Sequence, residues 1–287
     1  MNQAIVGQIE NILDSRILNA DSLRGGCVGQ VLCVELADGR KVVAKIGQDS
    51  QGSLAIEGAM LDYLSQRSSL PVPQVIHTGP NLLIMQLVAG TSRFSLKAER
   101  HAADLLADLH EHTSESFGFD FDTLIGGLSQ PNPRHTSWPE FFAENRLRFM
   151  ATQAMDAGRL PRTIHDRVFR LADDISQFIR ADTAPGLIHG DIWSGNVLAD
   201  GDQITGFIDP AIYFADPEIE LAFITLFNCF GSAFFDRYSD RRPIANGFFE
   251  TRRDLYNLYP LLVHVRLFGG SYVDSVKRTL ERFGYAG

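Results

Sequence analysis

The feature that most constrains the fold of this chain is a change of pattern near Ala89-Gly90. Before that point, valine-rich segments at residues 31–36 and 41–46 flank a glycine-containing turn, which is typical of a β-hairpin. From residue 97 onward, the apolar residues recur mainly at helical spacing. The sequence therefore predicts two lobes of unlike composition, and a cleft between such lobes is a common place for a small ligand.

The predicted fold class is α+β, with residues 1–88 forming a small N-terminal lobe and residues 89–287 a larger, mainly helical lobe. The small lobe is expected to hold an antiparallel sheet and one helix at residues 53–66, after an opening helical stretch at residues 4–13. A further extended run is expected at residues 82–87. In the larger lobe, helices are expected at residues 98–110, 138–157, 162–179, 217–230 and 256–268, with a hairpin at 196–209.

The composition excludes several classes of protein. Hydrophobic residues make up 45% and charged residues 21% of the 287 residues, which is typical of a globular chain. A net charge of −9 argues against binding to nucleic acid. The most apolar run, residues 221–235, is too short to span a membrane and is expected to form a buried helix. Residues 1–10 lack the features of a signal peptide, so we expect a cytoplasmic protein, and three cysteines without a CxxC pair favour neither disulfides nor zinc.

The run HGDIWSGN at residues 189–196 is the strongest chemical signal. The hairpin that follows brings Asn196 and Asp209 to the same open end, and a carboxylate with an amide oxygen suits Mg²⁺. Asp191 is then free to accept a proton from an attacking hydroxyl, which is what phosphoryl transfer requires. The alternative is a loop of solvated polar residues. For His189 alone, we expect a bracing hydrogen bond rather than metal ligation.

A lysine and a glutamate in the first lobe supply an independent test of this interpretation. Lys45 ends the second strand of the first hairpin, and Glu57 interrupts the apolar stripe of the helix at residues 53–66. A lone carboxylate on a buried face is costly, so Lys45 is its expected partner. The alternative is a helix rotated enough for Glu57 to reach water.

The glycines before that hairpin are weaker signals. Gly25, Gly26 and Gly29 match neither GxGxxG nor a P-loop. A phosphate-covering loop and a simple turn both remain open interpretations.

Together these motifs resemble the fructosamine kinase (ketosamine kinase) family, a branch of the protein-kinase-like superfamily of small-molecule phosphotransferases. The resemblance spans nearly the whole chain and implies the two-lobe protein-kinase-like fold. Its motifs are Gly25-Gly26-Cys27, HGDIWSGN at residues 189–196, Asp209-Pro210-Ala211, Glu218-Ile219-Glu220-Leu221-Ala222 and Leu267-Phe268-Gly269-Gly270-Ser271-Tyr272. One departure is Ala215-Asp216-Pro217, which stands where the family usually has Gly-His and is typical of a helix start.

The resemblance implies roles for the catalytic and metal-binding residues. Asp191 is expected to be the catalytic base, and Asn196 and Asp209 are expected to hold Mg²⁺. Lys45, paired with Glu57, is expected to contact the phosphates of ATP.

The rest of the ATP site is implied in the same way. Gly25 and Gly26 would cover the phosphates. The backbone of Met85, Gln86 and Leu87 would receive the adenine.

On the acceptor side, Trp193 offers a flat apolar face to a sugar-like substrate, although packing beneath the loop is an equal alternative. His264 lines the same side or packs in the core, and Glu220 is expected to be a structural carboxylate. The expected partner is a small ketosamine or glycated amine, bound by a monomer or a homodimer.

The function implied is ATP-dependent phosphorylation of a sugar hydroxyl on a ketosamine. Two alternatives remain open: a kinase for an aminoglycoside, choline or simple sugar, and a non-catalytic nucleotide-binding protein of the same fold. An aminoglycoside would call for an acidic pocket, for which the candidate residues are Glu111, Glu115, Asp120 and Asp122.

Overall fold

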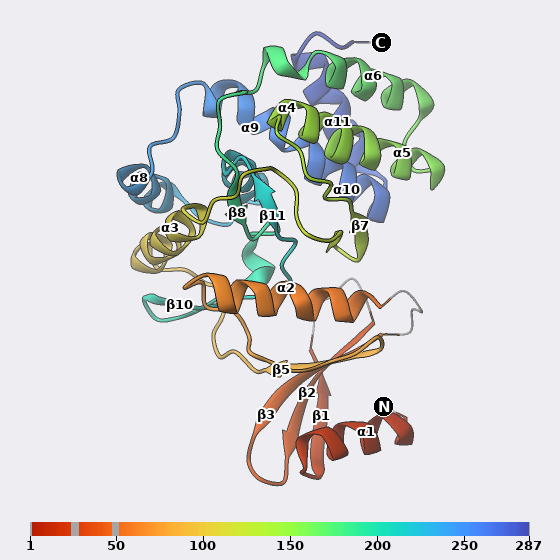
Figure 1. The fold of residues 1–287 in the computed structure, drawn as a ribbon, viewed down its shortest axis with the longest axis vertical. Helices are drawn as coiled ribbons and strands as arrows, with labels where there is room; N and C mark the ends of the chain where they lie inside the picture. The colour runs from red at the N-terminus through yellow and green to blue at the C-terminus, as the bar shows by residue number, and fades with distance from the viewer. Residues whose placement is uncertain (1, 24–28, 48–51, 287) are drawn as a thin grey trace.

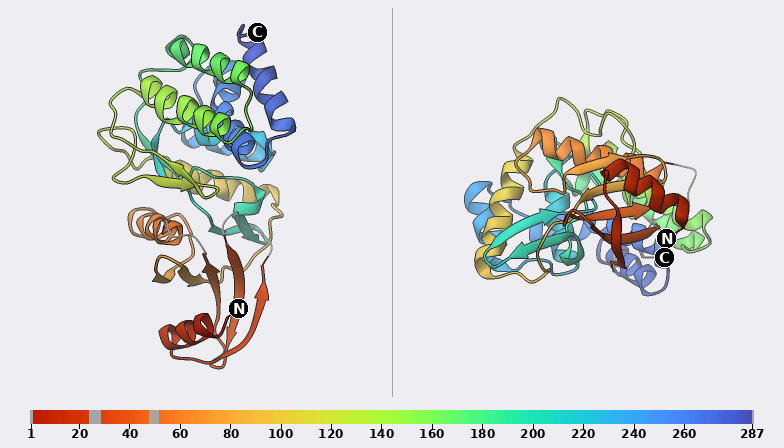
Figure 2. Two further views of the ribbon diagram at one scale, coloured as in Figure 1. Left: turned by 90° about the vertical axis from the view of Figure 1, so that its right-hand side faces the viewer. Right: turned by 90° about the horizontal axis from the view of Figure 1, so that it is seen from below.

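In the computed structural model, which describes residues 2–23, 29–47 and 52–286, a five-stranded sheet lies at one end of the molecule and a helical region at the other (Figure 1). The left view in Figure 2 shows the same division, with the N-terminal helix and the C-terminus at opposite ends of the long axis. The predicted α+β, two-lobe architecture is confirmed.

The sheet is antiparallel with strand order β1-β2-β3-β5-β4. Its strands are β1 (Ile17–Ser22), β2 (Gln30–Leu36), β3 (Lys41–Ile46), β4 (Val75–Thr78) and β5 (Leu82–Gln86). The β2–β3 hairpin and β5 match the sequence prediction, whereas β1 and β4 were not predicted. Both added strands lie at the edges of the sheet, where short or irregular sequences can still pair.

Side chains alternate across this sheet, so each face meets a different helix. One face packs against α1 (Gln3–Leu13) through Ile9 and Leu13. The other face contacts α2 (Ser53–Arg67), where Leu61 lies beside Val43 of β3. These two helices match the opening helical stretch and the helix at residues 53–66 that the sequence predicted.

The remaining chain is mainly helical and encloses one large apolar core. Its helices are α3 (Leu96–His110), α4 (Trp138–Phe142), α5 (Phe149–Asp156), α6 (Arg162–Asp173), α7 (Glu218–Leu226), α8 (Ser232–Arg241), α9 (Arg253–Tyr256), α10 (Leu258–Phe268) and α11 (Ser271–Arg282). Two π-helical segments, Ala143–Arg148 and Phe248–Arg252, and two 3₁₀ turns, Ile175–Gln177 and Ser194–Asn196, complete the helical elements. Three short two-stranded sheets are formed by β6 (Thr123–Ile125) with β7 (Leu128–Gln130), β8 (Gly186–Ile188) with β11 (Tyr213–Ala215), and β9 (Val197–Asp200) with β10 (Gln203–Phe207).

The structure corrects the predicted helices in three places. The helix expected at residues 162–179 ends as α6 at Asp173 and is followed by a 3₁₀ turn. Residues 138–157 form α4 and α5 with a π-helical segment between them rather than one continuous α-helix. The apolar run at residues 221–235 is not one helix, because α7 ends at Leu226 and α8 begins at Ser232. Asn228 between them has φ of 50°, a left-handed conformation that a continuing helix does not contain.

The chain passes between the lobes beside the β9–β10 hairpin. Thr91 and Ala199 exchange both backbone hydrogen bonds at 2.9 Å, and the Thr205 hydroxyl donates to the carbonyl of Ala89 at 2.6 Å. The linker is thus tied to the hairpin that bears the predicted metal ligands. Within the described ranges, no helix is long and apolar enough to cross a membrane.

Candidate active site

The loop at residues 189–193 leaves β8 and turns sharply before β9. Gly190 has φ of +86°, and a Cβ there would lie 2.2 Å from the carbonyl oxygen of Ala211. The backbone N–H of Ala211 donates to the carbonyl of His189 at 2.7 Å. Only glycine fits this close contact, which holds the loop against the segment that follows β10.

Asp191 and Asn196 are joined directly within this loop. Nδ2 of Asn196 donates to Oδ2 of Asp191 at 2.8 Å and to the backbone carbonyl of Asp191 at 3.0 Å. Desolvation, followed by the negative charge of Asp209, raises the pKa of Asp191 to about 7. A carboxylate with a pKa near neutral pH is suited to accept a proton during catalysis.

His189 is fully buried behind this loop. Its burial lowers the pKa of the imidazole to about 4, so the ring is neutral at physiological pH. The backbone N–H of Asp191 approaches Nδ1 at 3.4 Å, which fits the bracing role expected from the sequence.

Lys45 reaches from β3 across to the helical lobe. Its ammonium donates to Oε1 of Glu57 at 2.6 Å and also to Oδ1 of Asp209. Lys45 is only 6% exposed, and although burial alone lowers its pKa, the two carboxylates outweigh that effect and raise it. The predicted pairing with Glu57 is therefore present, and the same cation joins the two lobes at Asp209.

The residues at the end of the hairpin fit a hard divalent cation. Ile208 donates its backbone N–H to the carbonyl of Asn196 at 2.9 Å, which brings Asp209 close to Asn196. The amide nitrogen of Asn196 is engaged with Asp191, which leaves its oxygen Oδ1 on the other side of the amide group. That oxygen accepts no hydrogen bond from a described residue. A carboxylate and a free amide oxygen match the ligands that Mg²⁺ takes alongside phosphate and water oxygens.

The structure also shows an apolar surface beside Lys45. Val31, Val43 and Met85 share its face of the sheet and form a cluster with Leu87. This surface is suited to a planar base, and strand parity with Lys45 could have identified Val31 and Val43 in the sequence.

The other predicted residues of the ATP site lie close to this cluster or outside the described chain. Met85 and Gln86 end β5, and Leu87 follows it. Gly25 and Gly26 lie outside the described residues.

The two predicted acceptor residues lie in different surroundings. Trp193 is 41% exposed, and a Cβ at Gly195 would lie 2.3 Å from its ring, so the indole rests on that glycine with its other face open. His264 is partly buried, and its Nδ1 is 2.7 Å from the carbonyl of Pro260. Its ring is surrounded by those of Phe227, Phe268 and Tyr272. Trp193 and His264 share no ring contact among the described aromatic pairs.

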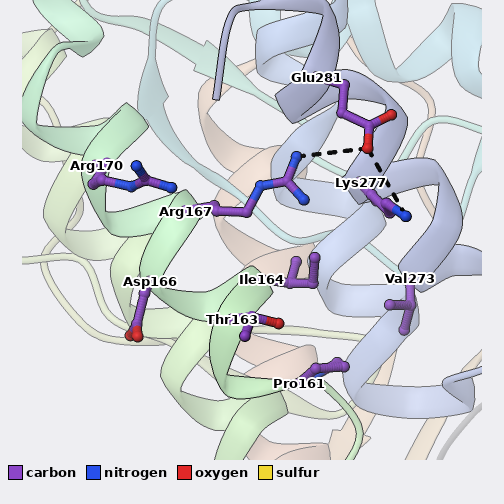
Figure 3. Close-up of a pocket in the computed structure, with 9 residues that line it drawn as sticks. All are labelled: Pro161, Thr163, Ile164, Asp166, Arg167, Arg170, Val273, Lys277 and Glu281. Carbon is purple, nitrogen blue, oxygen red and sulfur yellow. Dashed lines mark ion pairs between the residues drawn. The ribbon is translucent and has the colours of Figure 1, made fainter. Parts of the chain in front are cut away.

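A separate surface groove of about 710 Å³ lies between α6 and α11, at the end of the helical lobe far from the sheet (Figure 3). Arg167 of α6 lies 3.9 Å from Glu281 of α11 across it, and Lys277 lies 3.9 Å from Glu281 on the same helix. It contains none of the predicted site residues, so the groove does not compete with the loop at residues 189–196 as the candidate active site.

Known structures share this architecture. An aminoglycoside phosphotransferase solved as a ternary complex with streptomycin and ATP is 14% identical, with a TM-score of 0.66 over 98% of this chain and 96% of its own. A structure from Thermobifida fusca, assigned as a fructosamine-3-kinase, is 30% identical with a TM-score of 0.86 over 98% of this chain and all of its own. The fold is therefore that of the protein-kinase-like phosphotransferases.

Sequence comparisons narrow the class to one family. The sequence model of the fructosamine kinase family matches residues 1–284. A protein from Synechocystis named "Probable ketoamine kinase" is 33% identical, covering 93% of this chain and 90% of the relative. A chloroplastic protein-ribulosamine 3-kinase of Oryza sativa subsp. indica is 30% identical, covering 94% and 80%. The chain belongs to the fructosamine kinase family, as the sequence motifs indicated.

Proposed function

We propose that this protein is an ATP-dependent kinase that phosphorylates a sugar hydroxyl of a ketosamine. One observation carries the proposal: in a member of the fructosamine kinase family, Asp191 and Asn196 are joined in one loop while Lys45 bridges Glu57 and Asp209. The relatives named ketoamine kinase and protein-ribulosamine 3-kinase support the substrate class. The ATP complex of the aminoglycoside phosphotransferase of the same fold supports the nucleotide.

In this proposal the first lobe binds the nucleotide. The apolar cluster of Val31, Val43, Met85 and Leu87 packs against the adenine, whose polar edge meets the backbone of residues 85–87. Lys45 neutralises the phosphates once its bond to Asp209 is exchanged for phosphate oxygens. Gly25 and Gly26 are assigned to the loop that covers the phosphates.

Asn196 and Asp209 would hold Mg²⁺, which supplies charge neutralisation at the phosphates when it is bound. Asp191 orients the acceptor hydroxyl and receives its proton at a carboxylate oxygen as the hydroxyl oxygen attacks the γ-phosphorus, the bond from that phosphorus to the bridging oxygen breaks, and ADP leaves. The hydrogen bond from Asn196 keeps that carboxylate aimed in one direction. Its pKa near 7 matches this proton transfer.

The acceptor is proposed to lie over the open face of Trp193, with His264 as a second contact. Since Nδ1 of His264 is engaged by the carbonyl of Pro260, Nε2 is the nitrogen left to accept a hydrogen bond from the substrate. The burial that lowers the pKa of His264 favours this neutral form.

The structure weakens the case for a polycationic aminoglycoside. Asp120 pairs with Arg134, and Asp122 accepts the backbone N–H of Asn132 at 2.9 Å. These two carboxylates therefore have partners within the fold and do not form a free acidic pocket.

We also propose a cytoplasmic location and a monomeric or homodimeric state. Fractionation and light scattering are the measurements that test these two points.

The function is tested by ADP release from Mg²⁺ and ATP with fructosyl-lysine, ribulosyl-lysine, kanamycin, choline and simple sugars. Turnover with the ketosamines, lost in Asp191→Asn, is the expected result. Turnover only with another acceptor would refute the ketosamine assignment, and no turnover with any acceptor would favour a binding role.

A further inference from the structure

The loop that bears Asp191 is anchored by a buried carboxylate of the helical lobe. The backbone N–H of Gly190 donates to Oε1 of Glu220 at 2.6 Å. Glu220 lies on α7, and its side chain is fully buried. Because Gly190 directly precedes Asp191, this bond fixes the backbone one residue from the proposed base.

The second oxygen of Glu220 continues into a chain of buried side chains. Nε2 of His110, the last residue of α3, lies 2.8 Å from Oε2 of Glu220. Nδ1 of His110 lies 2.7 Å from the hydroxyl of Tyr238 on α8. The hydroxyl can donate or accept, so it can complement either tautomer of His110.

Charge strengthens this chain. Burial alone raises the pKa of Glu220, but the hydrogen bond and charge of His110 outweigh it and the net pKa is lowered. The carboxylate therefore stays ionised, and hydrogen bonds to an ionised acceptor are roughly twice as strong as neutral ones.

Ion pairs hold α8, which carries Tyr238, against α3, which carries His110. Arg237 and Arg241 of α8 lie 2.8 Å and 3.0 Å from Asp104 of α3. Arg241 also contacts Asp108 at 2.5 Å. The distance between His110 and Tyr238 is thus set by the packing of α8 on α3.

We propose that His110 and Tyr238 are positioning residues for phosphoryl transfer, acting through Glu220 on the loop of Asp191. This inference rests on the proposed function for its catalytic consequence. Among the described residues, the backbone N–H of Gly190 has no acceptor other than Oε1 of Glu220. Loosening the anchor therefore displaces the base, and small displacements of reacting groups are costly to the rate.

The first test compares Tyr238→Phe with Tyr256→Phe. Tyr256 is equally buried, and its hydroxyl donates to Oδ2 of Asp216 at 2.8 Å and accepts from Nε1 of Trp138 at 2.9 Å. Tyr256→Phe therefore also removes a buried, hydrogen-bonded hydroxyl, but one with no direct contact to Glu220 or Gly190. We expect Tyr238→Phe to lower kcat by at least about fivefold relative to this control, with the KM for ATP within about twofold of wild type. Equal kcat values in the two variants would overturn the proposal.

A second pair of variants separates positioning from packing. Glu220→Gln keeps an oxygen for the Gly190 amide, whereas Glu220→Ala removes it. Higher kcat in Glu220→Gln than in Glu220→Ala is expected, measured well below both melting temperatures. Equal loss in both would contradict an action through this hydrogen bond.

Hydrogen exchange, which needs no substrate, separates this inference from the proposed function. Peptides covering residues 186–193 are expected to exchange faster in Tyr238→Phe than in Tyr256→Phe. If that difference appears while the wild-type enzyme phosphorylates no ketosamine, the anchor is supported and the proposed function fails. Equal exchange in the two variants would refute the anchor itself.

Discussion

Replacing Asp191 with asparagine removes the charge of the proposed base while preserving its shape. Desolvation and then the charge of Asp209 raise the pKa of this group from 3.8 to about 7. Between these values the folded protein binds the proton more tightly than the unfolded chain, so the carboxylate destabilises the fold as pH rises. The full difference corresponds to about 4 kcal/mol, and because the side chain is partly exposed we expect about 1–2 kcal/mol at pH 8.

The assay is urea unfolding of nucleotide-free and metal-free protein at pH 5 and pH 8. Asp191→Asn is expected to be more stable than wild type at pH 8, with about a third of that gain at pH 5. Asp200→Asn, in the exposed β9–β10 turn, serves as the matched control and should change neither value. Turnover of Asp191→Asn should fall by about 10²- to 10⁴-fold with ATP affinity nearly intact. A stability gain that is equal at the two pH values, or near-normal turnover, would refute the reasoning.

Three further variants test other parts of the site. Lys45→Met leaves Glu57 buried without its cation, so the free energy of unfolding, measured with urea, should fall by roughly 3 kcal/mol. The KM for ATP, measured by steady-state kinetics, should rise at least about tenfold, and unchanged values of both quantities would contradict the ion pair. Asp209→Asn should weaken binding of Mg²⁺–ATP in calorimetry, and wild-type affinity would exclude Asp209 as a ligand. Gly190→Ala should lower the melting temperature and abolish turnover because its Cβ would lie 2.2 Å from the carbonyl oxygen of Ala211, whereas a stable, active variant would show that the loop can relax.

Local sequence patterns predicted much of the fold. The hairpin of β2 and β3 follows from two valine-rich segments around a turn at Gly39, whose φ is 88°. Burial of Glu57 on the apolar stripe of α2 predicted its pairing with Lys45, which is present at 2.6 Å. These features depend on residues close in sequence or on the cost of one buried charge, so a single chain suffices to predict them.

Other features depend on contacts between distant residues. The edge strands β1 and β4 form because β2 and β5 offer open hydrogen-bonding edges, and their own sequences hold little alternation. The link from Tyr238 through His110 to Glu220 joins residues more than 100 positions apart. The sequence marked Glu220 as a structural carboxylate, but its partners became visible only when three helices were brought together.

The roles of the site residues stay predictions until chemistry is measured. The motifs predicted which side chains would gather, and the structure places Asp191, Asn196, Asp209 and Lys45 around the hairpin end and the strand that faces it. Which acceptor hydroxyl reacts depends on the shape of the acceptor pocket, which we propose includes Trp193 and His264, and residue identity alone does not specify that shape.

Phosphorus NMR of a reaction containing ATP, Mg²⁺ and fructosyl-lysine tests the central claim most directly. The account predicts a new phosphomonoester signal coupled to a sugar proton, with ADP formed in equal amount, and no such signal with Asp191→Asn. ATP hydrolysis to inorganic phosphate without a sugar phosphomonoester, or an undiminished signal with Asp191→Asn, would contradict it.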